Sequence, residues 1–173
     1  DAVPYQLNES KQTGLYLQDQ AQWDKWYLTL GGRYDWSQQA TTVRGDGGGY
    51  VERNDKKFNW RGGVNYLFDN GITPYFSYSQ SFEPSDFDLW SKPRQFYAPT
   101  KDEQSEAGVK YVPHDRSVVL TAAGYELPKT NNLTSDTSIP TGQVPTGVIR
   151  VRELESEAQP AVNAPINLLA SYP

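Results

Sequence analysis

The stretch Leu28-Thr29-Leu30-Gly31-Gly32-Arg33-Tyr34-Asp35-Trp36 decides the fold, because apolar and polar residues alternate along it. A β-strand points successive side chains to opposite faces. One face of this strand therefore carries leucine and aromatic side chains, and the other carries threonine, arginine and aspartate. The alternation returns in residues 58–68, where Phe58 and Trp60 share a face and Arg61 lies on the other. These stretches predict an all-β fold with one apolar and one polar face.

The same period extends over most of the chain and predicts a meander of about eight antiparallel strands. They are expected at residues 11–22, 26–40, 56–68, 72–83, 101–112, 117–130, 144–159 and 166–172. The links alternate strictly in length: short turns at 23–26, 69–71, 113–116 and 159–165, and long loops at 41–55, 84–100 and 131–143. Outer-membrane barrels have short periplasmic turns and longer extracellular loops. A soluble Greek-key sandwich has no reason to keep that order.

Strand length and aromatic placement also indicate a membrane wall. Crossing the apolar slab takes about 9–11 tilted residues, and most of the expected strands are that long. Aromatic residues gather near the short turns (Trp23, Trp26, Tyr66, Phe68, Tyr111) and toward the long loops (Tyr34, Trp36, Phe82). Such rings favour the headgroup level and form two girdles, although cross-strand aromatic pairs also occur in soluble sheets. The sequence therefore predicts a transmembrane β-barrel wall.

Composition excludes several other classes of protein. The net charge of -5 argues against nucleic acid as the main partner. The absence of cysteine excludes a disulfide framework, a thiolate metal site and a cysteine nucleophile. The single histidine, His114, lies between Pro113 and Asp115, which is typical of a turn. We expect no enzyme active site and no bound metal.

Six segments, in order, resemble the barrel domain of TonB-dependent siderophore receptors, most closely the hydroxamate (ferrichrome) type. They are Gln12-Thr13-Gly14-Leu15-Tyr16-Leu17-Gln18-Asp19-Gln20, Leu30-Gly31-Gly32-Arg33-Tyr34-Asp35, Trp60-Arg61-Gly62-Gly63-Val64-Asn65-Tyr66, Pro74-Tyr75-Phe76-Ser77-Tyr78-Ser79-Gln80-Ser81-Phe82-Glu83-Pro84, Glu106-Ala107-Gly108-Val109-Lys110-Tyr111 and Lys129-Thr130-Asn131-Asn132-Leu133. Each motif is weak alone, but six in the right order over nearly the whole chain are specific.

The resemblance implies a bacterial outer-membrane receptor that imports ferric siderophores, with energy from TonB. It also implies a 22-stranded barrel with an internal plug. Residues 1–173 would then be a partial barrel domain, with the plug and the C-terminal strands absent from this chain. Expected partners are outer-membrane lipid, the TonB complex through the plug, and phage or colicin at the external loops. The ferric siderophore is the transported ligand, and no cofactor is expected to bind this chain directly.

This sequence departs from the family pattern near its end. Arg152-Glu153-Leu154-Glu155-Ser156-Glu157 has Glu153 where the family usually has glycine and Ser156 at an apolar position. Pro128 falls inside an expected strand, where it removes a donor from the ladder. These departures make the hairpin after Glu153 the weakest part of the prediction.

Two groups of residues are candidates for function. The first is a set of polar residues expected to face the lumen: Arg33, Asp35, Arg61, Glu106 and Lys110. Two interpretations are open: they contact the plug or a passing ligand, or they pair with one another and with water. The second lies in the loop at 84–100: Phe87, Trp90, Arg94, Phe96 and Tyr97. Two interpretations are open here as well: the aromatic residues bind a ligand, or they pack the loop against neighbouring loops. The three alternating glutamates after Arg152 admit a metal or acid-base site, but a polar lumen wall is favoured.

Two other architectures remain open. A self-contained barrel of eight strands, with a structural or adhesive role, fits the length, although Gly31, Gly63 and Gly108 would then line a lumen that needs filling. A soluble β-sheet binding module would leave a large apolar patch in water.

Overall fold

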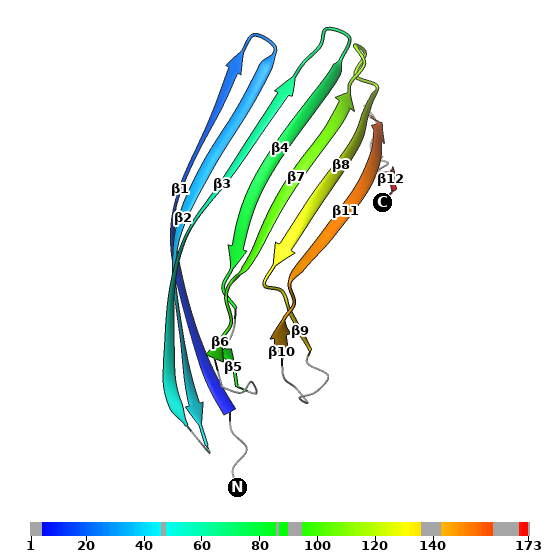
Figure 1. Cartoon of the computed structure of the whole chain (residues 1–173). Coiled ribbons are helices and arrows are strands. Elements are labelled where there is room, and N and C mark those ends of the chain that lie inside the picture. The colour runs from blue at the N-terminus through cyan, green and yellow to red at the C-terminus, as the bar shows by residue number, and fades with distance from the viewer. Residues whose placement is uncertain are drawn as a thin grey trace.

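The computed structural model describes residues 5–45, 48–85, 87–89, 95–135, 143–160 and 170–172. Its main feature is one antiparallel sheet of eight strands (Figure 1). In order across the sheet these are β1 (Tyr5–Trp23), β2 (Trp26–Arg44), β3 (Gly49–Tyr66), β4 (Ile72–Glu83), β7 (Thr100–Tyr111), β8 (Val118–Thr130), β11 (Val148–Pro160) and β12 (Ala170–Tyr172). Each strand pairs with its neighbour in sequence, which confirms the predicted meander.

The register separates the two kinds of side chain onto two faces. Tyr34 pairs with Phe58, and Leu28 pairs with Val64, so apolar residues of β2 and β3 share a face. Asp35 pairs with Lys57 on the other face. Because the side-chain period of a strand is two, one register fixes the facing of every residue in the hairpin.

Short and long connections lie at opposite ends of the sheet (Figure 1). At the first tight turn Asp24 has φ 52°, and at the second Gly71 has φ 84°, both in the left-handed region that such turns require. Lys25 Nζ donates to Asp69 Oδ2 across 2.6 Å, which ties these two turns together. The Asp69 carboxylate, through this hydrogen bond, raises the pKa of Lys25 above its usual value.

The prediction of a loop over residues 41–55 is wrong in its length. β2 continues to Arg44 and β3 begins at Gly49, with Val43 paired to Gly49. Polar residues extend the ladder because the alternation of buried and exposed positions persists, with Ser37, Gln39, Thr41 and Val43 all buried. The glycine run supplies only the tip, where Gly45 has φ 100°.

The other two long connections contain short hairpins of their own. β5 (Phe87–Asp88) pairs with β6 (Gln95–Phe96) within the predicted loop at 84–100. β9 (Leu133–Ser135) pairs with β10 (Gln143–Pro145) around the predicted loop at 131–143. Both hairpins lie at the same end of the sheet as the β2–β3 tip (Figure 1).

The sheet is open within the described residues. β1 and β12 occupy its two edges and do not pair with one another, so the closed barrel of eight strands considered above does not form. β11 pairs with β8 along thirteen positions, from Val148 with Thr130 to Pro160 with Val118. Pro128 is accommodated opposite Arg150 in this ladder. The predicted last turn lies mostly outside the described residues. In the described part of the chain, no helix has the length and apolar character that a membrane crossing requires.

Candidate functional site

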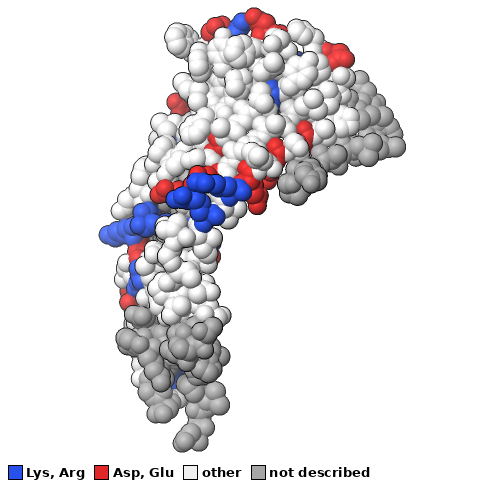
Figure 2. All heavy atoms as spheres, turned by 45° about the vertical axis from the view of Figure 1, so that its right-hand side comes forward, with Lys and Arg blue, Asp and Glu red and all other residues white. Residues whose placement is uncertain are grey.

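The outer face carries an apolar band bounded by aromatic side chains. Its large residues are open to the surroundings, and Leu30 is 63% exposed. Near the short turns the Trp26 and Tyr66 rings lie 4.8 Å apart, and toward the long loops the Tyr34 and Trp36 rings lie 4.6 Å apart. Figure 2 shows a mostly uncharged surface between charges at the short turns and charges where the long loops begin. This is the surface that lipid would cover.

The inner face of β1, β2 and β3 centres on a buried carboxylate. Asp35 is only 2% exposed. Arg33 Nε donates to its two oxygens at 2.8 and 2.9 Å, and Gln12 Nε2 donates to Oδ1 at 3.1 Å. The structure therefore pairs two of the predicted lumen residues with each other, which neutralises the buried charge.

Arg61 lies on the same face but has neutral partners. Its Nη2 donates to the Tyr16 hydroxyl at 2.8 Å and to Gln18 Oε1, and its guanidinium lies 5.8 Å from the centre of the Tyr16 ring. A groove of about 620 Å³ runs between this residue and the Arg33–Asp35 pair. Its polar lining combines two guanidinium groups with hydroxyl and amide groups, which both donate and accept hydrogen bonds.

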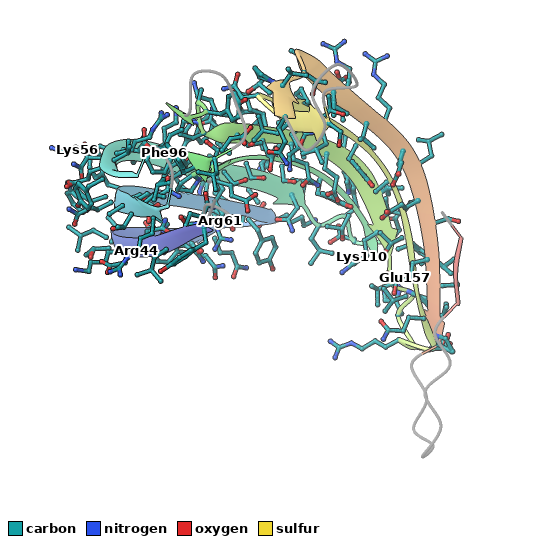
Figure 3. All side chains as sticks on the ribbon, turned by 90° about the horizontal axis from the view of Figure 1, so that it is seen from below. Arg44, Lys56, Arg61, Phe96, Lys110 and Glu157 are labelled. Atoms are coloured by element: carbon teal, nitrogen blue, oxygen red, sulfur yellow. The ribbon has the colours of Figure 1, made fainter. Side chains whose placement is uncertain are left out.

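A second groove, of about 400 Å³, lies on the inner face nearer the short turns. Tyr75 contributes to its wall and donates a hydrogen bond of 2.7 Å to Glu106 Oε1. Lys110 and Glu157 line the same groove and lie on the concave side of the curved sheet (Figure 3). Arg33, Asp35, Arg61, Glu106 and Lys110 thus share the concave face, but they form separate groups along it.

The three glutamates of β11 also lie on this face, where the Tyr125 hydroxyl donates to Glu153. Among the described residues no group of three His, Cys, Asp or Glu side chains is placed to hold a metal ion. His114 lies in the turn between β7 and β8. A polar wall is the arrangement these residues form.

The aromatic residues of the second long loop pack against other loops. Phe87 is 4% exposed and Tyr97 is 9% exposed, while Phe96 is half-buried beside them. The Phe87 and Phe96 rings meet edge to face at 5.2 Å. These contacts correspond to the loop-packing alternative. Trp90 and Arg94 lie outside the described residues, so ligand contact by this group stays a prediction.

Sequence reasoning missed the residues that hold this loop. Arg53 Nη1 donates to the Tyr97 carbonyl oxygen at 2.7 Å, and Arg53 also binds Asp55 at 2.7 and 3.1 Å. Val43 packs in the same apolar cluster as Phe87. The sequence signal that could have found these residues is the period-two alternation of residues 49–57, because it places Arg53 and Asp55 on one face of a strand.

Comparison with known proteins assigns the class and the family. The fold and its two faces define a section of transmembrane β-barrel wall. The family model described as "TonB dependent receptor-like, beta-barrel" matches residues 2–167. The chain belongs to this family, and its place is the bacterial outer membrane.

Individual relatives agree with this assignment. The chain is 55% identical over 170 residues to the ferrichrome outer membrane transporter/phage receptor of Escherichia coli K12, covering 98% of this chain and 22% of that protein. It is 34% identical to the ferrioxamine receptor of Yersinia enterocolitica, covering 97% of this chain and 23% of the relative. The chain therefore spans less than a quarter of the length of these relatives, both of which are named as transporters or receptors.

Solved structures show the same fold at low sequence identity. The siderophore receptor PiuA from Acinetobacter baumannii superposes with a TM-score of 0.75 at 20% identity, over 95% of this chain and 26% of that chain. The alcaligin receptor FauA from Bordetella pertussis superposes with a TM-score of 0.69 at 22% identity, over 96% of this chain and 30% of that chain. In both, the matched part is a portion of a larger chain, as expected for a partial barrel.

Proposed function

We propose that this chain is part of the wall of an outer-membrane receptor that imports ferric siderophores of the hydroxamate type, with energy supplied through TonB. The observation that carries the proposal is the 55% identity to a ferrichrome transporter across 98% of the chain. In this role the ferric siderophore is cargo rather than a resident cofactor.

The concave face supports this role through its chemistry. Hydroxamate chelates present oxygen atoms, which accept hydrogen bonds, and the groove beside Arg61 offers guanidinium, hydroxyl and amide donors. An aqueous or protein-filled lumen also suits the buried oxygens of Ser37, Gln39 and Asn59, which have no hydrogen-bond partner within the described residues. A plug domain elsewhere in the receptor would occupy such a lumen and engage TonB.

Uptake of labelled iron by the full-length receptor tests this proposal. The receptor would be expressed in cells that lack other hydroxamate receptors, and uptake of iron-55 bound to ferrichrome or ferrioxamine B would be compared with uptake of a ferric catecholate. We expect TonB-dependent uptake of a hydroxamate complex. Correct insertion into the outer membrane with no hydroxamate uptake would reject the substrate class.

A second role is attachment of phage or colicin at the external loops. It is favoured by the naming of the 55% identical relative as a phage receptor and by the length of the β2–β3 hairpin, which projects beyond the aromatic girdle at Trp36. Adsorption of phage to cells with and without the full-length receptor would test this role separately from iron uptake.

A further inference from the structure

We propose that the described part of the connection between β4 and β7 is a fixed strut of the outer entrance, locked to two neighbouring connections before any ligand binds. The strut consists of residues 84–85, 87–89 and 95–99. Its effect on import rests on the proposed function, whereas the locking itself does not.

The first lock joins the strut to the β2–β3 hairpin. The Tyr97 carbonyl oxygen accepts hydrogen bonds from Arg53 Nη1, at 2.7 Å, and from the Ser85 hydroxyl. Asp55 holds the Arg53 guanidinium through two hydrogen bonds from Nε and Nη2, so the donor is oriented on the strand. Bidentate pairs of this kind fix direction as well as distance.

The second lock joins the strut to the connection between β8 and β11. The Tyr97 hydroxyl donates to the Gln143 carbonyl oxygen at 2.5 Å, and it also lies 3.2 Å from Asp88 Oδ2. The Gln143 backbone N–H donates to the same Asp88 oxygen at 3.4 Å. One tyrosine therefore connects three parts of the outer surface, through its main chain on one side and its hydroxyl on the other.

An apolar cluster closes the contact between the locks. Val43 of the hairpin packs with Phe87 and Leu89 of the strut, and Phe96 packs against them. This is the hydrophobic core found among the described residues, and it lies outside the membrane band. Swinging the strut away would expose these side chains to water, at a cost that scales with the apolar area. A segment that opened routinely would bury few such contacts.

Thiol labelling in whole cells tests the lock directly. The full-length receptor would carry Val43→Cys beneath the strut or, as a matched control, Thr42→Cys on the opposite face of the same strand. A membrane-impermeant maleimide would be added without siderophore and then with it. We expect Val43→Cys to react about tenfold more slowly than Thr42→Cys in both conditions. Equal rates, or protection only with siderophore, would overturn the proposal.

A second variant identifies the residue responsible. Tyr97→Phe in the Val43→Cys background keeps the ring and removes the hydroxyl lock, and we expect labelling about fivefold faster, the effect of one hydrogen bond. Tyr27→Phe is the matched control, because its hydroxyl accepts a hydrogen bond from Gln22 Nε2 at the short-turn end of the sheet, away from the strut, and its loss should leave the rate unchanged. A Tyr97→Phe rate equal to that of this control would overturn the assignment of the lock to Tyr97.

Import kinetics connect the strut to the entrance. Tyr97→Phe alone should raise the half-saturating siderophore concentration about fivefold and leave the maximal rate unchanged, because a strut positions the entrance without taking part in translocation. An unchanged half-saturating concentration would refute its place at the entrance. If the unaltered receptor imports nothing, the proposed function fails, and the labelling result still decides the strut.

Discussion

Three glycines of the inner face lie beneath side chains from a neighbouring strand. Arg33 and Asp35 cover Gly14, Arg61 covers Gly31, and the Tyr75 ring covers Gly108. Because glycine has no Cβ, a long side chain can lie flat over it on the sheet. The polar end of that side chain then reaches a hydrogen-bond partner. These glycines therefore support the polar wall that the candidate residues form.

Gly108→Ala should disturb the Tyr75–Glu106 hydrogen bond. A Cβ at this position would lie 2.7 Å from the Tyr75 ring, so the ring must move. We expect the free energy of unfolding of the full-length receptor to fall by about 1–3 kcal/mol, the usual cost of overpacking. Urea titration in detergent would measure it. Gly63→Ala is the control, because its nearest contact is an ordinary 3.6 Å; an equal loss in both variants would contradict this explanation.

At the scale of elements, the β2–β3 hairpin is longer than a membrane crossing requires. Its outer face beyond the girdle is held by Glu52, which accepts hydrogen bonds from Asn54 at 2.8 Å, Gln38 at 2.9 Å and Tyr50 at 3.0 Å. Its inner face is held by the strut. Two different sets of contacts thus keep the ladder paired where no lipid covers it.

Acidification should weaken the outer set of contacts. The hydrogen bonds from Asn54, Gln38 and Tyr50 hold the pKa of Glu52 below its usual value of 4.5. Since the folded pKa is the lower one, their contribution to stability is present above pH 4.5 and is lost as the pH falls through the folded pKa. An NMR titration of the Glu52 carboxyl carbon should give a midpoint below 4.5. A midpoint at or above that value would show that these hydrogen bonds do not form.

The two faces of β2 should respond differently to a charge. Leu30 lies on the outer face between the two girdles, so Leu30→Arg should destabilise the full-length receptor by about 2–4 kcal/mol in lipid vesicles. Thr29→Arg, one position earlier, places the same side chain on the inner face beside a groove and should cost much less. Unfolding titrations in vesicles would compare them, and equal losses would refute the assignment of faces.

At the scale of the molecule, an open sheet exposes two edges. Within the described residues β1 and β12 do not pair with one another, so the outer edge of each presents unpaired backbone groups. Such groups are costly in lipid, and spanning sheets are closed for this reason. The wall therefore needs further strands to complete it.

Residues 1–173 expressed alone should fail to form a stable barrel. In detergent we expect aggregates and no shift in gel migration between heated and unheated samples, because the two free edges associate. The full-length receptor should show that shift. A monodisperse, heat-modifiable species from the short chain would contradict this expectation and would revive the small closed barrel.

Alternation by itself determined the all-β class, the eight strands, the two faces and the order of short and long links, because the period of two in a strand is a local property. It also placed Arg33, Asp35, Arg61, Glu106 and Lys110 together on one face. Only the tertiary structure decided that Asp35 binds Arg33 while Arg61 binds neutral partners. It also decided that residues 41–44 and 49–55 continue strands. Finally, it decided that Arg53 and Tyr97 hold the outer connections together. These features depend on contacts between residues up to 55 positions apart, such as Asp88 with Gln143, which no local pattern encodes.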